Sequence, residues 1–352
     1  MHLFVTGVTG FIGSHFVEAA LAAGHTVTGL YRSESNGNRE VVAILRERGA
    51  NLVRGDILQP DTYVHALQDV DCVCHFAAAF REGGAGESYF DRVNVEGTAH
   101  VVRTAAGRGV RRFVHCSTAG VYGQRVPGVI DESAPLQAWN EYERSKLAAE
   151  EVVRAAAPAM EYVILRPTAV YGPRDQRLRK LFRAVARGRF PLFGRGEGRR
   201  HMIYVTDLAQ AFLCACTTQN GANQELIVAG PRATALRDLL DTLARAAQRR
   251  AFGPRLPLKP MLLVAAAVED VCAKLKVPPP IYRRRMDFYL NDAAFDSTRA
   301  QHLLGWRPLV DLEEGFAATL ASVGKSVGRS ISAVLVATLL LAAGPEALAA
   351  AL

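Results

Sequence analysis

Lysine is scarce in this chain of 352 residues, because it supplies only six of the 42 basic side chains and arginine supplies the rest. The basic residues are spread along the chain and form no stripe interleaved with aromatic residues, which disfavours nucleic acid as a partner. The formal net charge of +8 instead favours small anionic molecules or a membrane surface. Since lysines are so few, the position of each one is informative.

The six cysteines lack the spacing of a zinc site. Two pairs are separated by one residue, Cys72 with Cys74 and Cys214 with Cys216, and the other two stand alone. We therefore expect no metal site and six reduced, mostly buried thiols. The start of the chain also lacks the basic and apolar stretches of a secretory signal, since a strand-like run, Leu3–Val5, begins at once. These features predict a cytoplasmic protein.

Apolar residues are plentiful, at 49% of the chain, and their pattern predicts the fold. Residues 1–166 alternate short apolar runs with longer helical patterns, which is typical of a Rossmann-type, doubly wound α/β fold with a parallel sheet. Strands are expected at Leu3–Val5, Thr26–Tyr31, Asn51–Arg54, Cys72–Phe76, Arg112–Ser117 and Tyr162–Arg166. Helices are expected at Ile12–Ala23, Glu40–Arg48, Tyr89–Gly107 and Tyr142–Ala156. The loops after the strands should meet at one edge of the sheet, where such sheets bind ligands.

The rest of the chain differs in kind. Residues 167–322 contain Pro- and Gly-rich stretches between helical pieces, which predicts a smaller C-terminal α/β substrate-binding domain interleaved with the first. Residues 323–352 form an apolar tail, and the run Ser330–Pro345 carries no charge. Three interpretations stay open for this tail: an anchor in the inner face of the membrane, a helix docked on the body or on a partner subunit, and a disordered end.

Three glycines follow the first expected strand and open the first expected helix, in the sequence Thr-Gly-Val-Thr-Gly-Phe-Ile-Gly. Glycine at positions 7, 10 and 13 allows a tight turn in which the backbone approaches a pyrophosphate, whose charge is stabilised by the helix N-terminus. The spacing predicts a dinucleotide site formed by Gly7, Gly10, Phe11, Ile12 and Gly13.

An acidic residue is absent at the end of the second expected strand, where a carboxylate would bind the ribose 2′-hydroxyl of NAD. Arg32 stands there instead and is able to pair with a 2′-phosphate, so the sequence favours NADP over NAD, unless Arg32 is an ordinary solvated side chain. Asp56 and Ile57 follow the third strand, where an acid suits the adenine amino group. A helix N-cap is the competing role for Asp56.

Tyr142 and Lys146 are four residues apart on an expected helix and therefore share one face. A phenol that exchanges a proton near pH 7 needs its pKa lowered by about three units, or about 4 kcal/mol. One positive charge about 4 Å away, at an effective dielectric of about 20, supplies about that much. The pair alone is weak evidence, since ten tyrosines and six lysines give an accidental match about one time in six. A competing interpretation is that Lys146 forms an ion pair with Glu150, four residues later on the same helix.

A hydroxyl-bearing segment, Ser117–Gly123, is expected at the same sheet edge. With it, the chain resembles the extended short-chain dehydrogenase/reductase superfamily, which includes NAD-dependent epimerase/dehydratases and 3β-hydroxysteroid-dehydrogenase-like enzymes. The resemblance covers residues 1 to about 320. Besides the glycine turn and the Tyr-x-x-x-Lys motif, it rests on His75-Phe76-Ala77-Ala78, Asn94-Val95-Glu96-Gly97-Thr98, Ser117–Gly123, Arg166–Pro173 and Arg200–Leu208.

The resemblance implies roles for single residues. Tyr142 would be the general acid/base, and Lys146 would lower its pKa and bind the nicotinamide ribose. Thr118 would polarise the substrate oxygen, and Asn94 would belong to the proton relay. Ala77 would line the cofactor site. The substrate would be bound by Ser117, Tyr171 and Arg200, the last of which matches an arginine that binds the diphosphate of nucleotide sugars; it is equally interpreted as a surface arginine.

Departures from the family patterns bear on the substrate. Ala119 and Gly120 stand where sugar 4,6-dehydratases carry an acidic pair, which disfavours dehydration. We expect an oxidoreductase or epimerase acting on a secondary alcohol or ketone carbon, first of a nucleotide-sugar-like substrate and second of a lipid or steroid-like alcohol. A non-catalytic dinucleotide sensor is the third hypothesis. Homodimers are common in the family that the chain resembles.

Overall fold

Seven parallel strands form the main sheet of the computed structural model, which describes residues 1–34, 38–80, 86–123, 128–156, 158–176, 178–186, 192–249, 255–274 and 289–322. Their order across the sheet is β10-β6-β5-β4-β1-β2-β3, and each neighbouring pair is parallel. The strands are β1 (His2–Thr6), β2 (Thr26–Tyr31), β3 (Asn51–Arg54), β4 (Cys72–His75), β5 (Arg112–Cys116), β6 (Glu161–Pro167) and β10 (Gln224–Val228). The Rossmann-type fold is confirmed, and the six predicted strands are present with bounds that differ by at most one residue.

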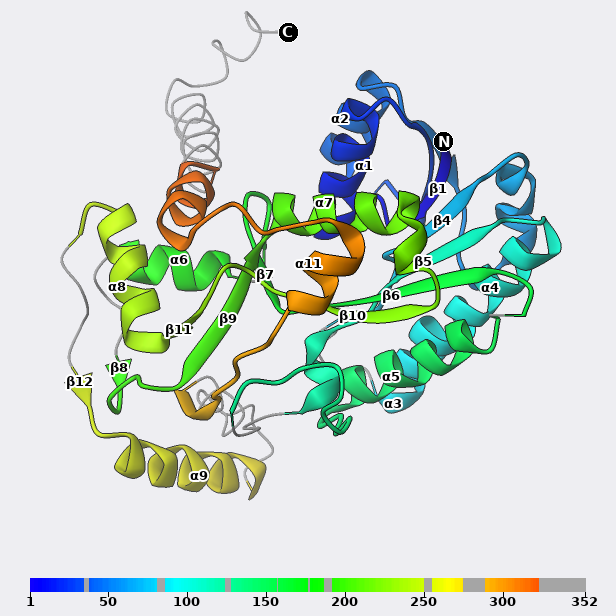
Figure 1. Cartoon of the computed structure of the whole chain (residues 1–352). Helices are drawn as coiled ribbons and strands as arrows, with labels where there is room; N and C mark the ends of the chain where they lie inside the picture. Colours follow the sequence, from blue (N-terminus) through cyan, green and yellow to red (C-terminus); the bar gives the residue numbers. More distant parts are fainter. Residues whose placement is uncertain are drawn as a thin grey trace, which may run out of the picture.

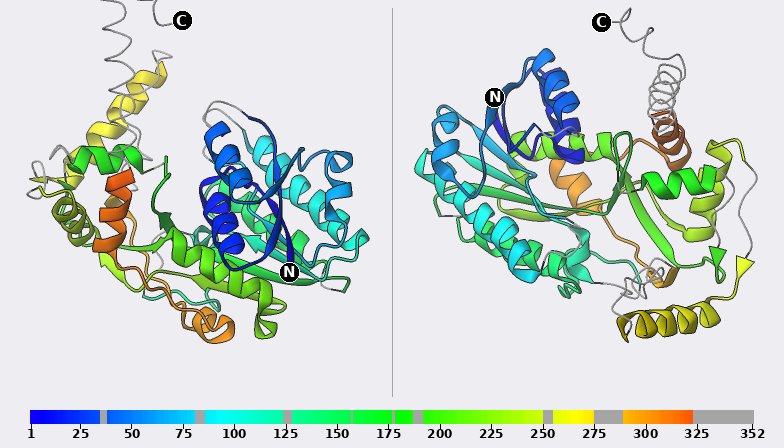
Figure 2. Two further views of the ribbon diagram at one scale, coloured as in Figure 1. Left: turned by 90° about the horizontal axis from the view of Figure 1, so that it is seen from above. Right: turned by 180° about the vertical axis from the view of Figure 1, so that it is seen from behind.

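Helices cover both faces of this sheet (Figures 1 and 2). One face carries α1 (Phe11–Ala22), α2 (Arg39–Glu47), α7 (Val205–Thr217) and α11 (Thr298–Leu304); the other carries α3 (Glu87–Phe90), α4 (Gly97–Gly107) and α5 (Glu141–Arg154). Side chains alternate along β1, so Leu3 and Val5 pack under α1 and α7 while Phe4 packs under α4. Two buried layers therefore hold the strand ends in fixed positions.

The helix predicted over Tyr89–Gly107 is interrupted. Between α3 and α4 lies a π-helical turn, η3 (Asp91–Glu96). Such turns insert an extra residue into a helix and re-aim the side chains on it. Here the turn carries Asn94, which is fully buried.

The second unit has a smaller core of its own. A three-stranded sheet, ordered β11-β9-β7, packs with α6 (Arg179–Ala186) and α8 (Leu236–Ala246) around Phe182, Leu240 and Phe316. Its strands are β7 (Ala169–Tyr171), β9 (Arg199–Tyr204) and β11 (Ala233–Ala235). A two-stranded pair, β8 (Leu192–Phe193) with β12 (Arg255–Leu256), leads to α9 (Leu258–Lys274).

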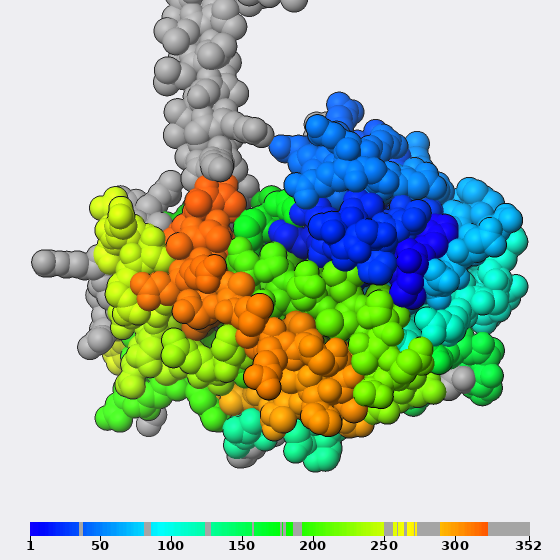
Figure 3. Space-filling model, turned by 45° about the horizontal axis from the view of Figure 1, so that its top comes forward, coloured from blue at the N-terminus to red at the C-terminus, as the bar shows by residue number. Residues whose placement is uncertain are grey.

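The chain passes between the two units several times. Both α7 and β10 follow β9 in sequence but complete the first unit, where Phe212 of α7 packs on Phe16 and Phe76. Residues 310–322 return to the second unit, where Phe316 packs in the core. Asp207, at the start of α7, accepts from the main-chain N–H of Leu309 and of Val310. Figure 3 shows this C-terminal segment, in orange, lying across the green surface. The interleaving of the two units thus follows from the positions of α7, β10 and the C-terminal residues.

The predicted apolar tail, residues 323–352, lies outside the described residues. Within the described part of the chain, no helix combines the length and apolar character that crossing a membrane requires.

Candidate active site

The glycine turn packs closely between β1, α1 and the end of β4. Gly7 has a φ of +71°, and a Cβ there would lie 2.7 Å from the Ala77 nitrogen. A Cβ at Gly13 would lie 2.3 Å from the Gly7 oxygen, and Gly10 N–H donates to that oxygen at 2.9 Å. Side chains at Gly7 and Gly13 would clash with this backbone, so glycine is needed for the tight turn at the N-terminus of α1. The turn fits a dinucleotide pyrophosphate.

Hydrogen bonds behind this turn fix the protonation of His75. Thr98 Oγ1 donates to the Asn94 main-chain oxygen at 2.6 Å, so His75 Nε2, 3.0 Å away, donates to Thr98. His75 Nδ1 is then an acceptor, and it receives the proton of Thr6 Oγ1 at 2.8 Å. Thr6 in turn accepts from Ala77 N–H at 3.2 Å. Burial lowers the pKa of His75 to about 3, so the ring stays neutral.

The other predicted cofactor residues lie around the same edge. Phe11 and Ile12 are half-buried in the first turn of α1, and Arg32 is exposed at the end of β2. Asp56 accepts from Leu58 N–H at 3.0 Å, so its carboxylate already stabilises a local turn. Ile57 is buried in the core.

Helix α5 carries the predicted catalytic pair, and its first turn is capped. The Asn140 side chain accepts from Glu143 N–H at 3.0 Å, while the Glu143 carboxylate accepts from Trp139 N–H at 2.9 Å. The cap fixes Tyr142, which is half-buried and meets the Phe80 ring edge-on at 4.8 Å between centroids. Tyr142 is therefore held at the start of the helix, next to the end of β4.

Lys146 lies one turn further along α5, inside the molecule, with only 2% of its surface exposed. Its Nζ lies 3.1 Å from His115 Nε2 on β5. Burial lowers the pKa of Lys146 to about 8, although the neighbouring Cys116 and Glu150 act in the opposite direction. At neutral pH the group is still mainly an ammonium.

Thr118 follows β5 and ends the strand. Its Oγ1 accepts from Gly120 N–H at 3.1 Å and so caps the short turn η4 (Ala119–Tyr122). η4 packs against α5: a Cβ at Gly120 would lie 2.9 Å from a Glu143 carboxylate oxygen. The structure thus brings the Thr118 loop and the first turn of α5 to one sheet edge, as predicted.

Residues 3–230 match the model of the NAD dependent epimerase/dehydratase family. The chain belongs to this family.

Known proteins of several activities resemble this family member along most of its length. It is 29% identical to the 2-alkyl-3-oxoalkanoate reductase of Shewanella oneidensis over 344 residues, which cover 92% of this chain and 86% of the relative. It is 30% identical to a dTDP-glucose 4,6-dehydratase of Streptomyces griseus, covering 91% and 93%. The structure of UDP-glucose 4-epimerase from Thermotoga maritima with UDP-glucose matches with a TM-score of 0.74 at 25% identity, covering 93% and 100%. Named relatives of this epimerase/dehydratase-family chain are enzymes, which supports an enzyme here.

Asn94 links two segments of the candidate site by hydrogen bonds. Its side chain bonds to both main-chain polar atoms of Ala79, at 2.7 and 3.2 Å, and donates to Ser145 Oγ at 2.9 Å. Ser145 donates in turn to the Tyr142 main-chain oxygen at 2.8 Å. The π-helical turn therefore fastens the loop that carries Phe80 to the helix that carries Tyr142.

Ser117, predicted to bind substrate, is instead part of a buried ionic network. It is 3% exposed and donates to the Glu150 carboxylate, which also forms a two-point ion pair with Arg166 at 2.6 and 3.0 Å. Arg166 donates further to Tyr122 Oη at 2.7 Å and to Glu225. The Ser117 hydroxyl is committed to this network, which joins α5, β6 and β10 and which sequence spacing did not reveal.

Tyr171 and Arg200 are also engaged inside the protein. Tyr171 is 1% exposed, packs on Phe316 and donates to the Asp311 main-chain oxygen at 3.3 Å. Arg200 donates to the main-chain oxygens of Arg199 and Asn291, and burial lowers its pKa to about 10.

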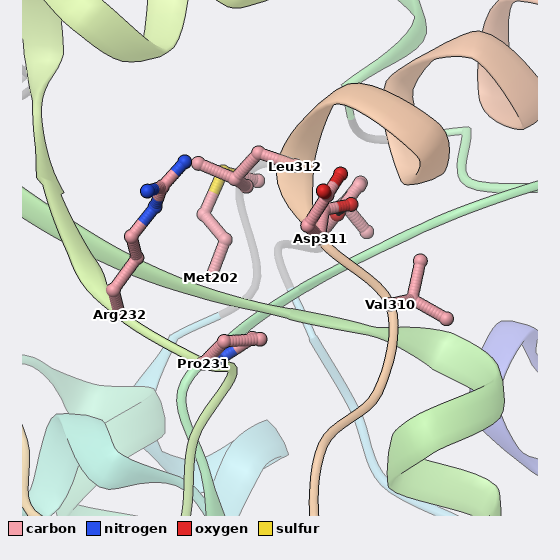
Figure 4. Close-up of a pocket in the computed structure, with 7 residues that line it drawn as sticks. Met202, Pro231, Arg232, Val310, Asp311 and Leu312 are labelled. Atoms are coloured by element: carbon pink, nitrogen blue, oxygen red, sulfur yellow. Dashed lines mark hydrogen bonds between the residues drawn. The ribbon is translucent and has the colours of Figure 1, made fainter.

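A small pocket beside Tyr171 belongs to the second unit. It is lined by Tyr171, Met202, Pro231, Arg232, Val310, Asp311 and Leu312, and Figure 4 shows Met202, Arg232 and Leu312 converging on it from different segments. This pocket holds none of the predicted catalytic residues.

Three of the six cysteines meet although their sequence spacing gave no such signal. The sulfur atoms of Cys72, Cys74 and Cys216 lie within 4.8 Å of one another, and Cys74 and Cys216 are 3.3 Å apart. All three are buried between β4 and α7. Burial raises the pKa of Cys74, and a hydrogen bond with Cys72 raises that of Cys216, so these two thiols stay protonated.

Proposed function

We propose that the protein is an NAD(P)-dependent oxidoreductase acting at a secondary alcohol or ketone carbon, with Tyr142 as general acid/base. The observation that carries this proposal is the buried Lys146 ammonium one helical turn after the half-buried Tyr142. Burying an ammonium costs free energy, because the ion loses its hydration. A buried charge one helical turn from a phenol supports a role in lowering the pKa of that phenol.

In this mechanism Tyr142 gives a proton to the carbonyl oxygen during reduction and removes it from the alcohol during oxidation. Lys146 stabilises the phenolate, and Thr118 donates a hydrogen bond to the same substrate oxygen. Asn94 holds the Phe80 loop in place relative to Tyr142. When bound, nicotinamide supplies or accepts the hydride.

Arg32 supports NADP as the preferred dinucleotide. It is exposed at the end of β2, beside the glycine turn, and a guanidinium pairs with a 2′-phosphate through two charge-assisted hydrogen bonds. Replacing it (Arg32→Ala) should raise the KM for NADPH at least about tenfold and leave that for NADH nearly unchanged. Equal changes for the two cofactors would contradict this preference.

For the substrate, the site favours a ketone with an apolar chain over a nucleotide sugar. Arg200, the residue predicted for a diphosphate, is bonded to main-chain oxygens, and the Phe80 ring lies against Tyr142. Two relatives matched over 92% of this chain are named 2-alkyl-3-oxoalkanoate reductase. We therefore place reduction of an oxoacyl-type ketone first, which reverses the order that the sequence suggested.

Nucleotide-sugar epimerisation is the second candidate. A structure of UDP-glucose 4-epimerase with UDP-glucose matches 93% of this chain. The activity of that protein supports this alternative. Dehydration has less support, because Ala119 and Gly120 offer no acid or base.

The experiment supplies the full-length protein with NADPH or NADH and, in parallel, with a 2-alkyl-3-oxoalkanoate or with UDP-glucose. We expect oxidation of NADPH with the oxoalkanoate. Tyr142→Phe should lower kcat/KM at least about 100-fold and change dinucleotide affinity less than about threefold. The matched control is Tyr162→Phe, at the opposite end of the strands. Conversion of UDP-glucose alone would favour the epimerase, and undiminished turnover in Tyr142→Phe would refute the role of Tyr142.

A further inference from the structure

Lys146 is held by a neighbour that no motif singled out, His115. The side chain of His115 is fully buried on β5, and its Nε2 lies 3.1 Å from Lys146 Nζ. An ammonium has protons to donate and no lone pair, so Nε2 must be the acceptor. The ring proton of a neutral His115 therefore sits on Nδ1.

The surroundings of His115 keep it neutral. Its Nδ1, which carries the ring proton, has no hydrogen-bond partner among the described residues. A second ring proton would have to sit on Nε2, facing the Lys146 ammonium. The His75 ring stacks on it at 5.5 Å with an interplanar angle of 22°. Burial, followed by the charge of Lys146 and the proximity of His75, holds the pKa of His115 well below its ordinary value. His115 is thus a neutral acceptor for the Lys146 ammonium.

The other groups that face Lys146 do not replace this contact. Cys116 on β5 and Glu150 on α5 raise the pKa of Lys146 electrostatically. Glu150, however, pairs with Arg166, whose positive charge offsets that of the carboxylate, and it also accepts from Ser117. His75, on β4, has both ring nitrogens engaged with Thr6 and Thr98.

A neutral acceptor suits a lysine that must act on a phenol. A carboxylate at this place would hold the ammonium equally well but would cancel its field at Tyr142. An apolar residue would leave the ammonium buried without an acceptor and favour its neutral form. An imidazole that cannot gain a proton holds the ammonium and leaves its charge uncompensated.

We propose that His115 is a positioning residue, which holds the Lys146 ammonium through Nε2 so that Lys146 remains charged and placed to act on Tyr142. The part that concerns Tyr142 rests on the function proposed above. The hydrogen bond itself does not, and it is open to a direct test without substrate.

That test is the NMR titration of lysines labelled at Cε in the full-length protein. With only six lysines in the chain, the signal of Lys146 is assigned as the one missing from Lys146→Arg. In His115→Leu, the midpoint of the Lys146 titration should fall by about one to two pH units, because a hydrogen bond to a charged group is lost. In His115→Gln, whose amide oxygen reaches the place of Nε2, the midpoint should stay within about half a unit of the wild type. An unchanged midpoint in His115→Leu would overturn the proposal, as would an equal fall in both variants.

Should His115→Leu fail to fold, His115→Asn replaces it, because the shorter amide does not reach Lys146. The midpoint should then fall in His115→Asn and not in His115→Gln. In each variant whose NMR midpoint falls, the decline of kcat/KM at high pH should also move to lower pH, because this decline reports loss of the Lys146 charge. A moved NMR midpoint together with full activity of Tyr142→Phe would refute the proposed function and keep the hydrogen bond; an unmoved midpoint with an inactive Tyr142→Phe would do the reverse.

Discussion

At the scale of single residues, the glycine turn tolerates no side chain at Gly13. We expect Gly13→Ala to destabilise the protein by several kcal/mol or to abolish dinucleotide binding, because a Cβ there would lie 2.3 Å from a main-chain oxygen. The control is Gly107→Ala at the end of α4, where a Cβ meets nothing within 4 Å. It should be neutral or stabilise by about 0.5–1 kcal/mol. Urea unfolding measures the stability of the two variants, and dinucleotide titration measures their affinity for the cofactor. Similar effects of the two substitutions would contradict the close packing of the turn.

Site residues that are close in sequence could be predicted, and those that are close only in space could not. The glycine turn is a local pattern, and so is the spacing of Tyr142 and Lys146. His115 is 31 residues before Lys146 and lies in an ordinary strand run, so only the alignment of β5 with α5 reveals its role. For Ser117 the family resemblance implies a substrate-binding role, whereas its partner in the structure, Glu150, lies 33 residues later on α5.

At the scale of elements, the ion pair of Arg166 with Glu150 joins β6 to α5. Arg166→Leu should cost about 3–5 kcal/mol of unfolding free energy, since it removes the two-point ion pair of a fully buried carboxylate and leaves only Arg154, at 3.7 Å, as its basic partner. The matched control is Arg144→Leu, which removes the exposed pair with Glu87 from the same helix. It should cost less than about 1 kcal/mol. Denaturant unfolding compares the two, and equal losses would show that the buried network contributes no more than a surface pair.

The sequence located the elements of the first unit well, because strands covered on both faces are continuous apolar runs. It did not predict β10, a short run whose parallel partner β6 lies about sixty residues earlier. It also joined α3, η3 and α4 into one helix, since a single inserted residue barely disturbs helical periodicity. Both omissions concern pairings or geometry that depend on the completed fold.

At the scale of the whole molecule, buried histidines should make stability depend on pH. Burial lowers the pKa of His75 to about 3 and that of His15 to about 4. The unfolded chain therefore binds more protons between these values and about 6.5, so stability is complete above pH 6.5 and falls on acidification. Each such histidine contributes a slope of about 1.4 kcal/mol per pH unit at most.

Urea unfolding between pH 7 and 5 measures this slope above the range in which carboxylates titrate. His75→Gln should make the slope shallower, whereas the exposed His302→Gln should leave it unchanged. If His75→Gln retained the full slope, neutral burial of His75 would not be its source.

The return of β10 to the first sheet also affects how the protein is made. A ribosome delivers β6 long before α7 and β10, so the edge of β6 and the part of the sheet under α7 stay exposed until these elements are made. Unpaired strand edges invite association between chains. During synthesis the nascent chain should therefore depend on chaperones up to about residue 228. Until β10 is made, the main sheet lacks its last strand, so the first half of the chain cannot complete its fold.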